Sequence, residues 1–347
     1  MVDASSPTAR AANPAVLVTG AAGFMGSNLV RALVARGGVD VVAMDDLSGG
    51  FRENVPDSVA LVEGSVTDVA LVESLFREHR FEAVFHLAAY AAEGLSHFIR
   101  RFNYTNNVLG SVNLINQAVN HGCGCFVFTS SIAVYGAGQV PMREDLVPQP
   151  EDPYGIAKLA VELDLRAAHE MFGLDFVIFR PHNVYGEFQN IGDRYRNVVG
   201  IFMNQILKDE PLTIFGDGEQ QRAFSYVGDV VPVLADAPWT RGARNRVFNV
   251  GADTPCTVNE LAAAVREAMD APDHPVRHLD ARNEVVVAYA DHGAAREVFG
   301  TPSSTPLREG LARMAAWVRQ VGSRASPDFA GIEISRGLPP SWAGPQL

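Results

Sequence analysis

The chain has 347 residues, of which 47% are hydrophobic and 20% are charged. This composition suits one large α/β domain, or two smaller ones, with a sizeable core, and it argues against global disorder. The 28 Lys and Arg against 40 Asp and Glu leave a net charge of −12, which argues against nucleic acid as a partner, although local arginines can still hold a small anion.

The three cysteines and nine histidines form neither a disulfide framework nor the spacing of a metal site. We therefore expect no metal and a reducing, cytoplasmic location. Residues 1–13 lack the apolar run of a secretory signal and are expected to be a flexible extension. Because no stretch approaches the ~20 apolar residues of a membrane span, no membrane partner is expected.

Short apolar runs alternate with segments of helical periodicity through the first half of the chain. Such runs are typical of strands buried on both faces of a parallel sheet. We therefore expect an α/β, Rossmann-type, doubly wound parallel sheet over residues 14–180. The expected strands are Ala15–Thr19, Val39–Met44, Val59–Val62, Ala83–His86, Cys125–Thr129 and Phe176–Arg180, and the expected helices are Phe24–Ala35, Val66–His79, Ser96–His121 and Pro153–Phe172.

After Arg180 the regular alternation ends. Residues 181–322 are expected to form mainly a smaller C-terminal lobe over the carboxyl edge of the sheet, with some segments returning to the first domain. Residues 323–347, which contain four prolines, are expected to be a weakly ordered tail. The lobe is predicted to contain helices at Val198–Lys208, Val258–Met269 and Leu307–Val318 and an aromatic strand at Arg222–Val227.

A glycine-rich loop joins the first strand to the first helix. Glycines at such a junction let the backbone approach a diphosphate, whose charge is met by the helix N-terminus. A lone loop of this kind also occurs in ordinary tight turns, but Asp45 closes the next strand, where a carboxylate accepts hydrogen bonds from ribose hydroxyls and repels a 2′-phosphate. The loop and aspartate predict NAD rather than NADP, bound by Gly20, Gly23, Phe24, Met25, Gly26 and Asp45.

Ser131, Tyr154 and Lys158 form the candidate catalytic set. Tyr154 and Lys158 lie one turn apart on the same face of the expected helix. An ammonium near a phenol lowers its pKa from ~10 toward neutrality, so Tyr154 is predicted to act as a general base toward a sugar or alcohol hydroxyl. Taken alone, such a pair also fits a solvated helix face. Ser131 follows a buried strand and therefore lies at the edge where α/β sites form.

These motifs, taken together in order, resemble the extended short-chain dehydrogenase/reductases, in particular the nucleotide-sugar epimerase/dehydratase group. The matching segments span roughly residues 14–300 and include Thr19-Gly-x-x-Gly-x-x-Gly26, His86-Leu-Ala-Ala89, Asn107-Val-x-Gly110, Thr129-Ser-Ser-x-Ala-Val-Tyr-Gly136, Tyr154-x-x-x-Lys158, Arg180-x-x-Asn-Val-Tyr-Gly186 and Arg222-x-Phe-x-Tyr-Val-x-Asp229. The resemblance implies an NAD-binding first domain, a substrate-binding lobe and a nucleotide-sugar substrate, UDP-linked.

The resemblance also implies further contacts to the cofactor. Ala88 and Ala89 would pass beneath it, and Pro181 would pack near the nicotinamide. Asn107 would support the hydrogen-bond network of the active site. Val66 would contribute a backbone contact near the adenine, although Ser65 stands where the family usually has an aspartate.

On the substrate side, the resemblance assigns Asn183 and Arg222 to the diphosphate. Arg282 would supply a second phosphate contact through its planar fork, or else form a surface ion pair. Relatives that act on galactose often have a lysine where this chain has Ala91. Ala288 would gate the pocket beside the sugar C2 and leave room for an N-acetyl group, whereas a shift of the alignment onto Tyr289 would reverse that inference.

The reaction is inferred from Ile132 and Ala133. Similar 4,6-dehydratases have an Asp-Glu pair at these positions, and similar UDP-glucuronate decarboxylases have a glutamate at the second position, whereas Ile and Ala transfer no proton. NAD-dependent C4 epimerisation through a 4-keto sugar is therefore expected. The alternatives are a nucleotide-sugar 4-ketoreductase with the same three residues and a non-enzymatic dinucleotide sensor. The resemblance also implies a homodimer formed through the helices Ser96–His121 and Pro153–Phe172.

Overall fold

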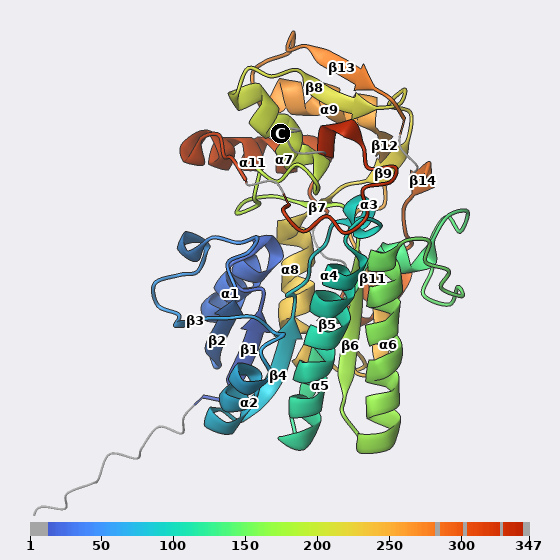
Figure 1. The fold of residues 1–347 in the computed structure, drawn as a ribbon. Helices are drawn as coiled ribbons and strands as arrows, with labels where there is room; N and C mark the ends of the chain where they lie inside the picture. The colour runs from blue at the N-terminus through green and yellow to red at the C-terminus, as the bar shows by residue number, and fades with distance from the viewer. Residues whose placement is uncertain (1–12, 282–284, 301–303, 327–328, 343–347) are drawn as a thin grey trace, which may run out of the picture.

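The computed structural model of the chain describes residues 13–281, 285–300, 304–326 and 329–342. Figure 1 shows a parallel sheet flanked by helices, with a smaller lobe of helices and short strands above it. Residues near the C-terminus cross back over the boundary between these two parts.

The central sheet has seven parallel strands in the order β11-β6-β5-β4-β1-β2-β3. The order reverses around β1, as in doubly wound folds. The last strand of this sheet in chain order, β11, pairs with β6 and so returns from the C-terminal half to complete the sheet. The strands are β1 (Ala15–Thr19), β2 (Asp40–Asp45), β3 (Leu61–Glu63), β4 (Phe81–His86), β5 (Cys125–Thr129), β6 (Phe176–Pro181) and β11 (Arg246–Val250).

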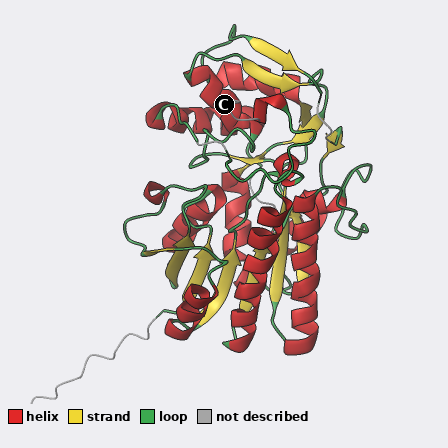
Figure 2. Ribbon diagram, viewed as in Figure 1, coloured by secondary structure: helices red, strands yellow, loops and turns green. Residues whose placement is uncertain are grey.

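Helices cover both faces of this sheet (Figure 2). In β1, Val16 and Val18 pack into the core beneath α1 (Phe24–Arg36) and α8 (Val227–Asp236). Leu17, between them, points to the opposite core beneath α2 (Val69–Glu78), α5 (Gly110–Asn120) and α6 (Pro153–Phe172). Successive residues of a strand face opposite sides, so burial of both sides explains the uninterrupted apolar runs.

The helix expected over Ser96–His121 begins later than predicted. A short helix, α3 (Glu93–Ser96), comes first, and α4 (Arg100–Tyr104) starts after a break. A π-helical turn, Thr105–Leu109, then leads into α5. The Glu333 carboxylate accepts the backbone amides of Arg101 and Phe102, each at 2.8 Å, so a distant segment caps this helix.

The lobe contains the predicted helices as α7 (Val198–Leu207), α9 (Val258–Ala268) and α11 (Leu307–Val321). The single strand expected over Arg222–Val227 is wrong. The chain instead forms β9 (Gln221–Ala223), which pairs with β12 (Pro255–Thr257) and β14 (Val287–Ala288), and then β10 (Ser225–Tyr226), which pairs with β7 (Val184–Tyr185). Between the two strands Phe224 is buried in the core, where the chain passes from one small sheet to the other. The remaining elements of the lobe are β8 (Leu212–Phe215), β13 (Val276–Leu279) and α10 (Gly293–Phe299).

The described residues between 323 and 342 are not the weakly ordered tail expected from their prolines. Phe329 packs at a tilt against Tyr90 and edge-on against Phe102, with ring centroids 5.2 and 4.9 Å apart. Trp342 is buried against Phe98 and Tyr195. We call residues 329–342 the C-terminal strap, since aromatic packing ties them across the two parts of the molecule.

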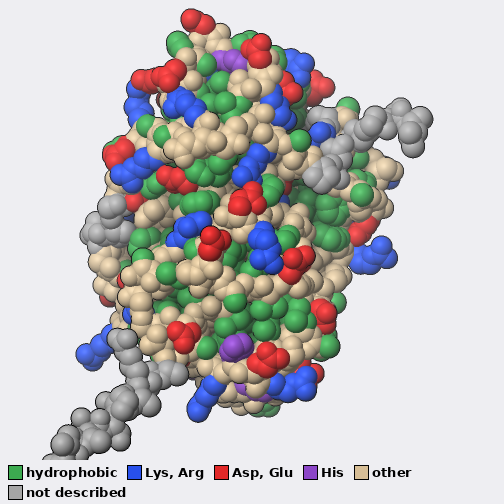
Figure 3. Space-filling view, turned by 90° about the vertical axis from the view of Figure 1, so that its left-hand side faces the viewer, with side chains coloured by type: hydrophobic (Ala, Val, Ile, Leu, Met, Phe, Trp, Pro, Cys, Tyr) green, Lys and Arg blue, Asp and Glu red, His purple; other side chains and the backbone are tan. Residues whose placement is uncertain are grey.

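No helix among the described residues has the length and apolar character needed to cross a bilayer. On the face shown in Figure 3, Lys and Arg side chains are interspersed with Asp and Glu side chains. Nucleic-acid binding surfaces gather cations into a stripe or patch, and this face has none among the residues drawn in colour.

Candidate active site

A cavity of ≈1880 Å³ lies at the carboxyl ends of the sheet strands, between the sheet and the lobe. Arg282 lies outside the described residues, and Asn107 does not line the cavity. The other predicted site residues all line it: Gly20, Gly23, Phe24, Met25, Gly26, Asp45, Val66, Ala88, Ala89, Ser131, Tyr154, Lys158, Pro181, Asn183, Arg222 and Ala288. The fold therefore brings together side chains from most of the length of the chain.

The loop between β1 and α1 has a shape that only glycine permits. A Cβ on Gly26 would lie 1.9 Å from the Gly20 carbonyl oxygen, and one on Gly20 would lie 2.7 Å from the Ala88 nitrogen. Gly20 also has a φ of +70°, which favours glycine. The backbone thus forms a close cradle that opens on the cavity where α1 begins, and this cradle fits the diphosphate of a dinucleotide.

Asp45 lies at the end of β2 with its side chain fixed toward this cradle. Its two carboxylate oxygens accept the backbone amides of Ala22 at 2.9 Å and Leu47 at 2.8 Å. Burial raises the pKa of the carboxyl, and those two hydrogen bonds oppose the shift. An aligned carboxylate at this position fits ribose hydroxyls and disfavours a 2′-phosphate, so the residues present fit NAD.

Asn107 supports the loop after β4, which lines the cavity. Its amide donates to the Tyr90 carbonyl at 3.1 Å, and its side-chain oxygen accepts the Tyr90 amide at 2.8 Å. Asn107 also donates to the side chain of Asn103 at 2.7 Å. It therefore fixes the backbone of the loop after β4, which lines the cavity, without reaching the cavity itself.

The three candidate catalytic residues lie together as predicted. Tyr154 and Lys158 are on α6, and the Lys158 ammonium lies 5.7 Å from the centre of the Tyr154 ring. Lys158 donates to the Thr129 carbonyl at 2.7 Å, which ties it to the end of β5. Ser131 follows that strand and accepts the Ala133 amide at 3.1 Å. The helix is positioned by Asp152, whose carboxylate caps it at Tyr154 and Gly155.

The ionisation of these residues differs from the sequence-based expectation. Burial raises the pKa of Tyr154, whereas a hydrogen bond with Ser131 opposes the shift. Burial lowers the pKa of Lys158 to about 7, against the opposing effect of Glu162. The chain's own groups therefore do not bring the phenol toward neutrality, and the expected lowering of its pKa depends on the nicotinamide cation as well as on Lys158.

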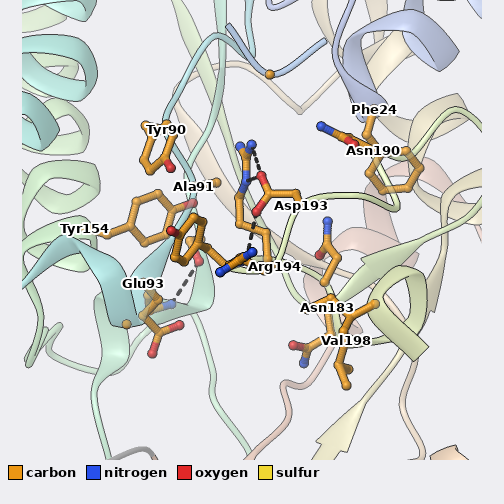
Figure 4. Close-up of a pocket in the computed structure, with 18 of the residues that line it drawn as sticks. Phe24, Tyr90, Ala91, Glu93, Tyr154, Asn183, Asn190, Asp193, Arg194 and Val198 are labelled. Atoms are coloured by element: carbon orange, nitrogen blue, oxygen red, sulfur yellow. Dashed lines mark hydrogen bonds and ion pairs between the residues drawn. The ribbon is translucent and has the colours of Figure 1, made fainter. Parts of the chain in front are cut away.

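Carboxylates also lie closer to Tyr154 than the sequence suggested. Both Glu93 and Asp152 add to the increase in its pKa, and Arg196 acts in the opposite direction. Glu93 lines the cavity at the start of α3 and, in Figure 4, lies on the same side as Tyr90, Ala91 and Tyr154. Two carboxylates that the residues at positions 132 and 133 do not indicate therefore lie near the phenol.

A second group missed from the sequence is on the loop before α7. Arg194 lines the cavity, and Figure 4 shows it between Tyr154 and the residues on the Phe24 side. Its neighbour Arg196 pairs with Asp193 and lies with its guanidinium carbon 5.0 Å from the centre of the Tyr90 ring. The only available signal was a charged Asp-Arg-Tyr-Arg run in a polar loop, which is common on protein surfaces.

A buried ion pair lies beneath the catalytic residues. Arg180 and Glu162 are 1% and 0% exposed, and their side chains bond at 2.9 and 2.5 Å. Glu162 also accepts a hydrogen bond from Ser130 at 2.5 Å. Glu162 is one turn beyond Lys158 on α6, so the pair fixes this helix against the ends of β5 and β6.

The predicted substrate side is formed by the lobe. Asn183 has a φ of +41° and donates to the Ala223 carbonyl at 3.1 Å. Arg222 donates to the carbonyls of Val286, at 3.1 Å, and Val285. Ala288 pairs in register with Arg222 and lines the cavity, whereas Tyr289 does not.

Among the described residues, no cluster of three or more His, Cys, Asp or Glu side chains has the arrangement of a metal site.

A family model described as "NAD dependent epimerase/dehydratase family" matches residues 16–251. The UDP-glucose 4-epimerase of Mycolicibacterium smegmatis is 36% identical over 310 residues, which cover 87% of this chain and 98% of that protein. A dTDP-glucose 4,6-dehydratase of Streptomyces antibioticus is 31% identical, covering 95% of this chain and 99% of its own.

The fold also matches a solved structure. The crystal structure of a UDP-glucose 4-epimerase from Thermotoga maritima with UDP-glucose has a TM-score of 0.84 and 34% identity. The match covers 88% of this chain and 99% of the other. The similarity therefore extends through both the sheet and the lobe.

Proposed function

Because the chain belongs to the NAD dependent epimerase/dehydratase family, whose members use NAD to modify nucleotide sugars, we propose that it catalyses C4 epimerisation of a nucleotide-diphosphate sugar. The observation that carries the proposal is the arrangement at the end of β5. Ser131, Tyr154 and Lys158 line the cavity, while Ile132 and Ala133 offer no acid or base there. Hydride transfer with a single proton carrier is the chemistry that such a site supports best.

In the proposed reaction, Tyr154 takes the proton of the C4 hydroxyl and later returns it to the C4 oxygen. NAD held by the glycine cradle and Asp45 would supply the hydride chemistry at C4. Ser131 donates a hydrogen bond to the C4 oxygen as it becomes a carbonyl. Since the chain's own groups keep the pKa of Tyr154 high, efficient proton removal near pH 7 requires further positive charge beside the phenol.

We propose that Asn183 and Arg222 hold the diphosphate while the 4-keto sugar turns over. The nucleotide is proposed to be UDP, and the sugar pair to be glucose and galactose or their N-acetylhexosamine counterparts. Ala288 supports the second pair, because a small side chain at the cavity wall leaves space beside C2. Residue 91 on this cavity is Ala rather than Lys, and Arg194 lines the same cavity.

The product of the reaction tests the proposal directly. The purified protein should be incubated with UDP-glucose, UDP-galactose and the two UDP-N-acetylhexosamines, and the products resolved by NMR spectroscopy. We expect the C4 epimer with no net change in NAD or NADH. Stoichiometric consumption of NAD(P)H would instead indicate a 4-ketoreductase, and a 4-keto-6-deoxy product would indicate a dehydratase.

Glu93 provides a second test, since it is a carboxylate on the cavity near Tyr154. An epimerase needs no second proton carrier, so the rate of epimerisation by Glu93→Gln should stay within about tenfold of the wild-type rate. Loss of a general acid or base would instead lower that rate roughly 100-fold or more. The rate of C4 epimer formation measures the difference. A 100-fold loss in this variant would contradict the single-carrier mechanism.

We also propose a homodimer in which α4, α5 and α6 pack against the same helices of a second copy. Leu109, Ile156 and Leu163 are 56%, 41% and 53% exposed. Exposed apolar residues on neighbouring helices favour such an interface. Light scattering on the purified protein would give the mass of a dimer, whereas the mass of a monomer would contradict the proposal.

A further inference from the structure

Two buried histidines meet end to end beside the candidate substrate site. His182 follows β6, directly after Pro181, and His292 precedes α10. Their Nε2 atoms lie 2.9 Å apart, and the centroids of the two rings are 5.1 Å apart. The side chains are 2% and 4% exposed. Neither histidine has a role in the reaction proposed above.

The partners of the two rings determine how many protons they share. The Nδ1 atom of His182 lies 3.0 Å from the Ala223 carbonyl oxygen, so it carries a proton and donates. The Nδ1 atom of His292 lies 2.7 Å from the Asp253 carboxylate, so it donates as well. If both rings were neutral, each Nε2 would present a lone pair to the other, and the 2.9 Å contact would be repulsive. A hydrogen bond there requires a third proton and hence one positive charge on the pair.

That charge is best placed on His292. Asp253 bonds His292 directly and also accepts two hydrogen bonds from Arg296, at 2.9 and 3.1 Å. Burial lowers the pKa of His182 to about 4, and the charge of His292 adds to this shift. The remaining charged group at this junction, Asp291, caps α10 through the Gly293 amide. His292 is therefore the donor and His182 the acceptor.

His182 shares its carbonyl partner with the candidate substrate contact. The Ala223 carbonyl accepts both from His182 and from the Asn183 side chain, at 3.0 and 3.1 Å. The His182 carbonyl in turn accepts from Ser225 at 2.9 Å. Asn183 has a left-handed φ of +41°, which needs support from its neighbours. The orientation of the His182 ring is therefore coupled to the position of Asn183.

We propose that His292 is a positioning residue: in its protonated form, paired with Asp253, it donates to His182 and so holds the turn from Pro181 to Asn183 in place for the substrate diphosphate. The role at the diphosphate rests on the proposed function, whereas the shared proton does not. Without this proton, the two lone pairs face each other and the turn loses its support. Binding of the nucleotide should then weaken while kcat changes little.

The proton itself is tested by ¹⁵N NMR spectroscopy of the histidine rings at pH 6–8. We expect His292 with both ring nitrogens protonated and His182 as a neutral ring protonated at Nδ1. Two neutral rings at pH 6, or a doubly protonated His182, would overturn the proposal. This readout does not depend on which reaction the enzyme catalyses.

The role at the substrate is tested by measuring the affinity for UDP by calorimetry, and KM and kcat with the sugar substrate, across the same pH range. His292→Gln keeps an amide donor that does not titrate, so its affinity should match the wild type at low pH and no longer fall as the pH rises. His292→Leu removes the donor and should weaken UDP binding about fivefold at every pH, as expected for one hydrogen bond. Asp253→Asn should shift the loss of affinity to lower pH, because it removes the stabilising anion.

The matched control is His278→Gln, which changes an exposed histidine on β13 and should leave the pH dependence unaltered. If His292→Leu does not fold, the change in the pH at which Asp253→Asn loses UDP affinity still tests the proposed role. Equal UDP affinity and equal pH dependence in the wild type, His292→Gln and Asp253→Asn would overturn the proposed role in positioning. Because UDP binding is measured without turnover, that outcome is distinguishable from failure to epimerise a sugar.

Discussion

The phenol of Tyr154 is the residue on which the proposed chemistry depends. It is 8% exposed, and both burial and two nearby carboxylates oppose its ionisation. Lys158 lies close but is itself buried, and its pKa falls to about 7. The protein therefore holds a protonated tyrosine at the cavity wall, and removal of its proton depends on charge that accompanies the ligands.

Replacing Tyr154 by Phe removes the only proton carrier in the proposed mechanism. We expect kcat for epimerisation to fall roughly 100- to 10,000-fold, whereas binding of NAD should be retained because the ring still packs. Tyr104→Phe, on α4 and away from the cavity lining, is the matched control and should keep its activity. Turnover in Tyr154→Phe at the wild-type rate would exclude this residue as the base.

Most of the predicted site residues line the cavity because they belong to motifs whose spacing is tied to the ends of strands. Glu93 and Arg194 were missed for a physical reason. Glu93 begins α3 and Arg194 lies in the loop before α7, and the path of both segments depends on packing between distant residues, such as Tyr90 against Arg196 and Phe329. Nothing in the local sequence shows that these two exposed charges line the cavity.

At the level of elements, helix ends were predictable where their capping groups are local. The expected helix Pro153–Phe172 has the same bounds as α6, because Asp152 caps its start, Pro153 occupies the first turn and Gly173 ends it in a left-handed conformation. The start of α4 was not predictable, since its cap is the distant Glu333. A cap that comes from a distant segment cannot be predicted from the residues next to the helix.

The turn between β1 and α1 should not tolerate a side chain at Gly26. The added Cβ of Gly26→Ala would overlap the Gly20 carbonyl, and we expect a loss of about 3 kcal/mol in the free energy of unfolding together with weakened NAD binding. Gly37→Ala is a useful comparison at the other end of α1. Its Cβ would meet nothing within 4 Å, so only its backbone (φ +68°, ψ −179°) should cost stability, about 1–3 kcal/mol, and NAD binding should be unaffected.

Chemical denaturation and NAD titration of both variants measure these effects. Equal stability and equal NAD affinity in Gly26→Ala and Gly37→Ala would show that the cradle is more adaptable than its geometry indicates.

The C-terminal strap is predicted to depend on Glu333. Replacing it by Ala removes the acceptor for two backbone amides of α4, which should cost roughly 1–2 kcal/mol locally and speed hydrogen exchange in the strap and at Phe102. Arg101→Ala is the control, because its side chain is 87% exposed and its ion pair with Glu333 is long, at 4.0 Å. Identical exchange in the two variants would assign the effect to the ion pair instead.

At the scale of the whole molecule, the doubly wound sheet was predictable because each central strand is apolar on both faces. The number of strands was underestimated, since β11 returns from the C-terminal half after the lobe has intervened. The sequence also did not predict that the chain passes from one small sheet to another at Phe224. Such pairings join residues far apart in sequence, and local periodicity carries no information about partners.

The stability of the molecule should fall in mild acid because of its buried histidines. Burial lowers the pKa of His86 to about 3 and of His182 to about 4, compared with ~6.5 in an unfolded chain. Between these values the unfolded state binds more protons, so the free energy of unfolding decreases as the pH falls. We expect roughly 2 kcal/mol per histidine to be lost between pH 6.5 and 5.

Denaturation at several pH values measures the slope of the free energy of unfolding against pH. His86→Gln, which can still bridge Thr19 and Ser111, should flatten it, whereas the exposed His278→Gln should not. The buried carboxyls of Asp45 and Asp152, whose pKa values burial raises, act in the opposite direction at lower pH. A slope unchanged by His86→Gln would mean that this ring is protonated in the folded protein.

The position of β11 in the sheet has a consequence for biosynthesis. Until Arg246–Val250 has left the ribosome, β6 has no neighbour on one side and exposes unpaired backbone amides and carbonyls along an apolar strand. An open edge of this kind is a template for association between nascent chains. Fragments ending before Arg246 should therefore aggregate, and independent expression of the dinucleotide half requires that this strand be supplied with it.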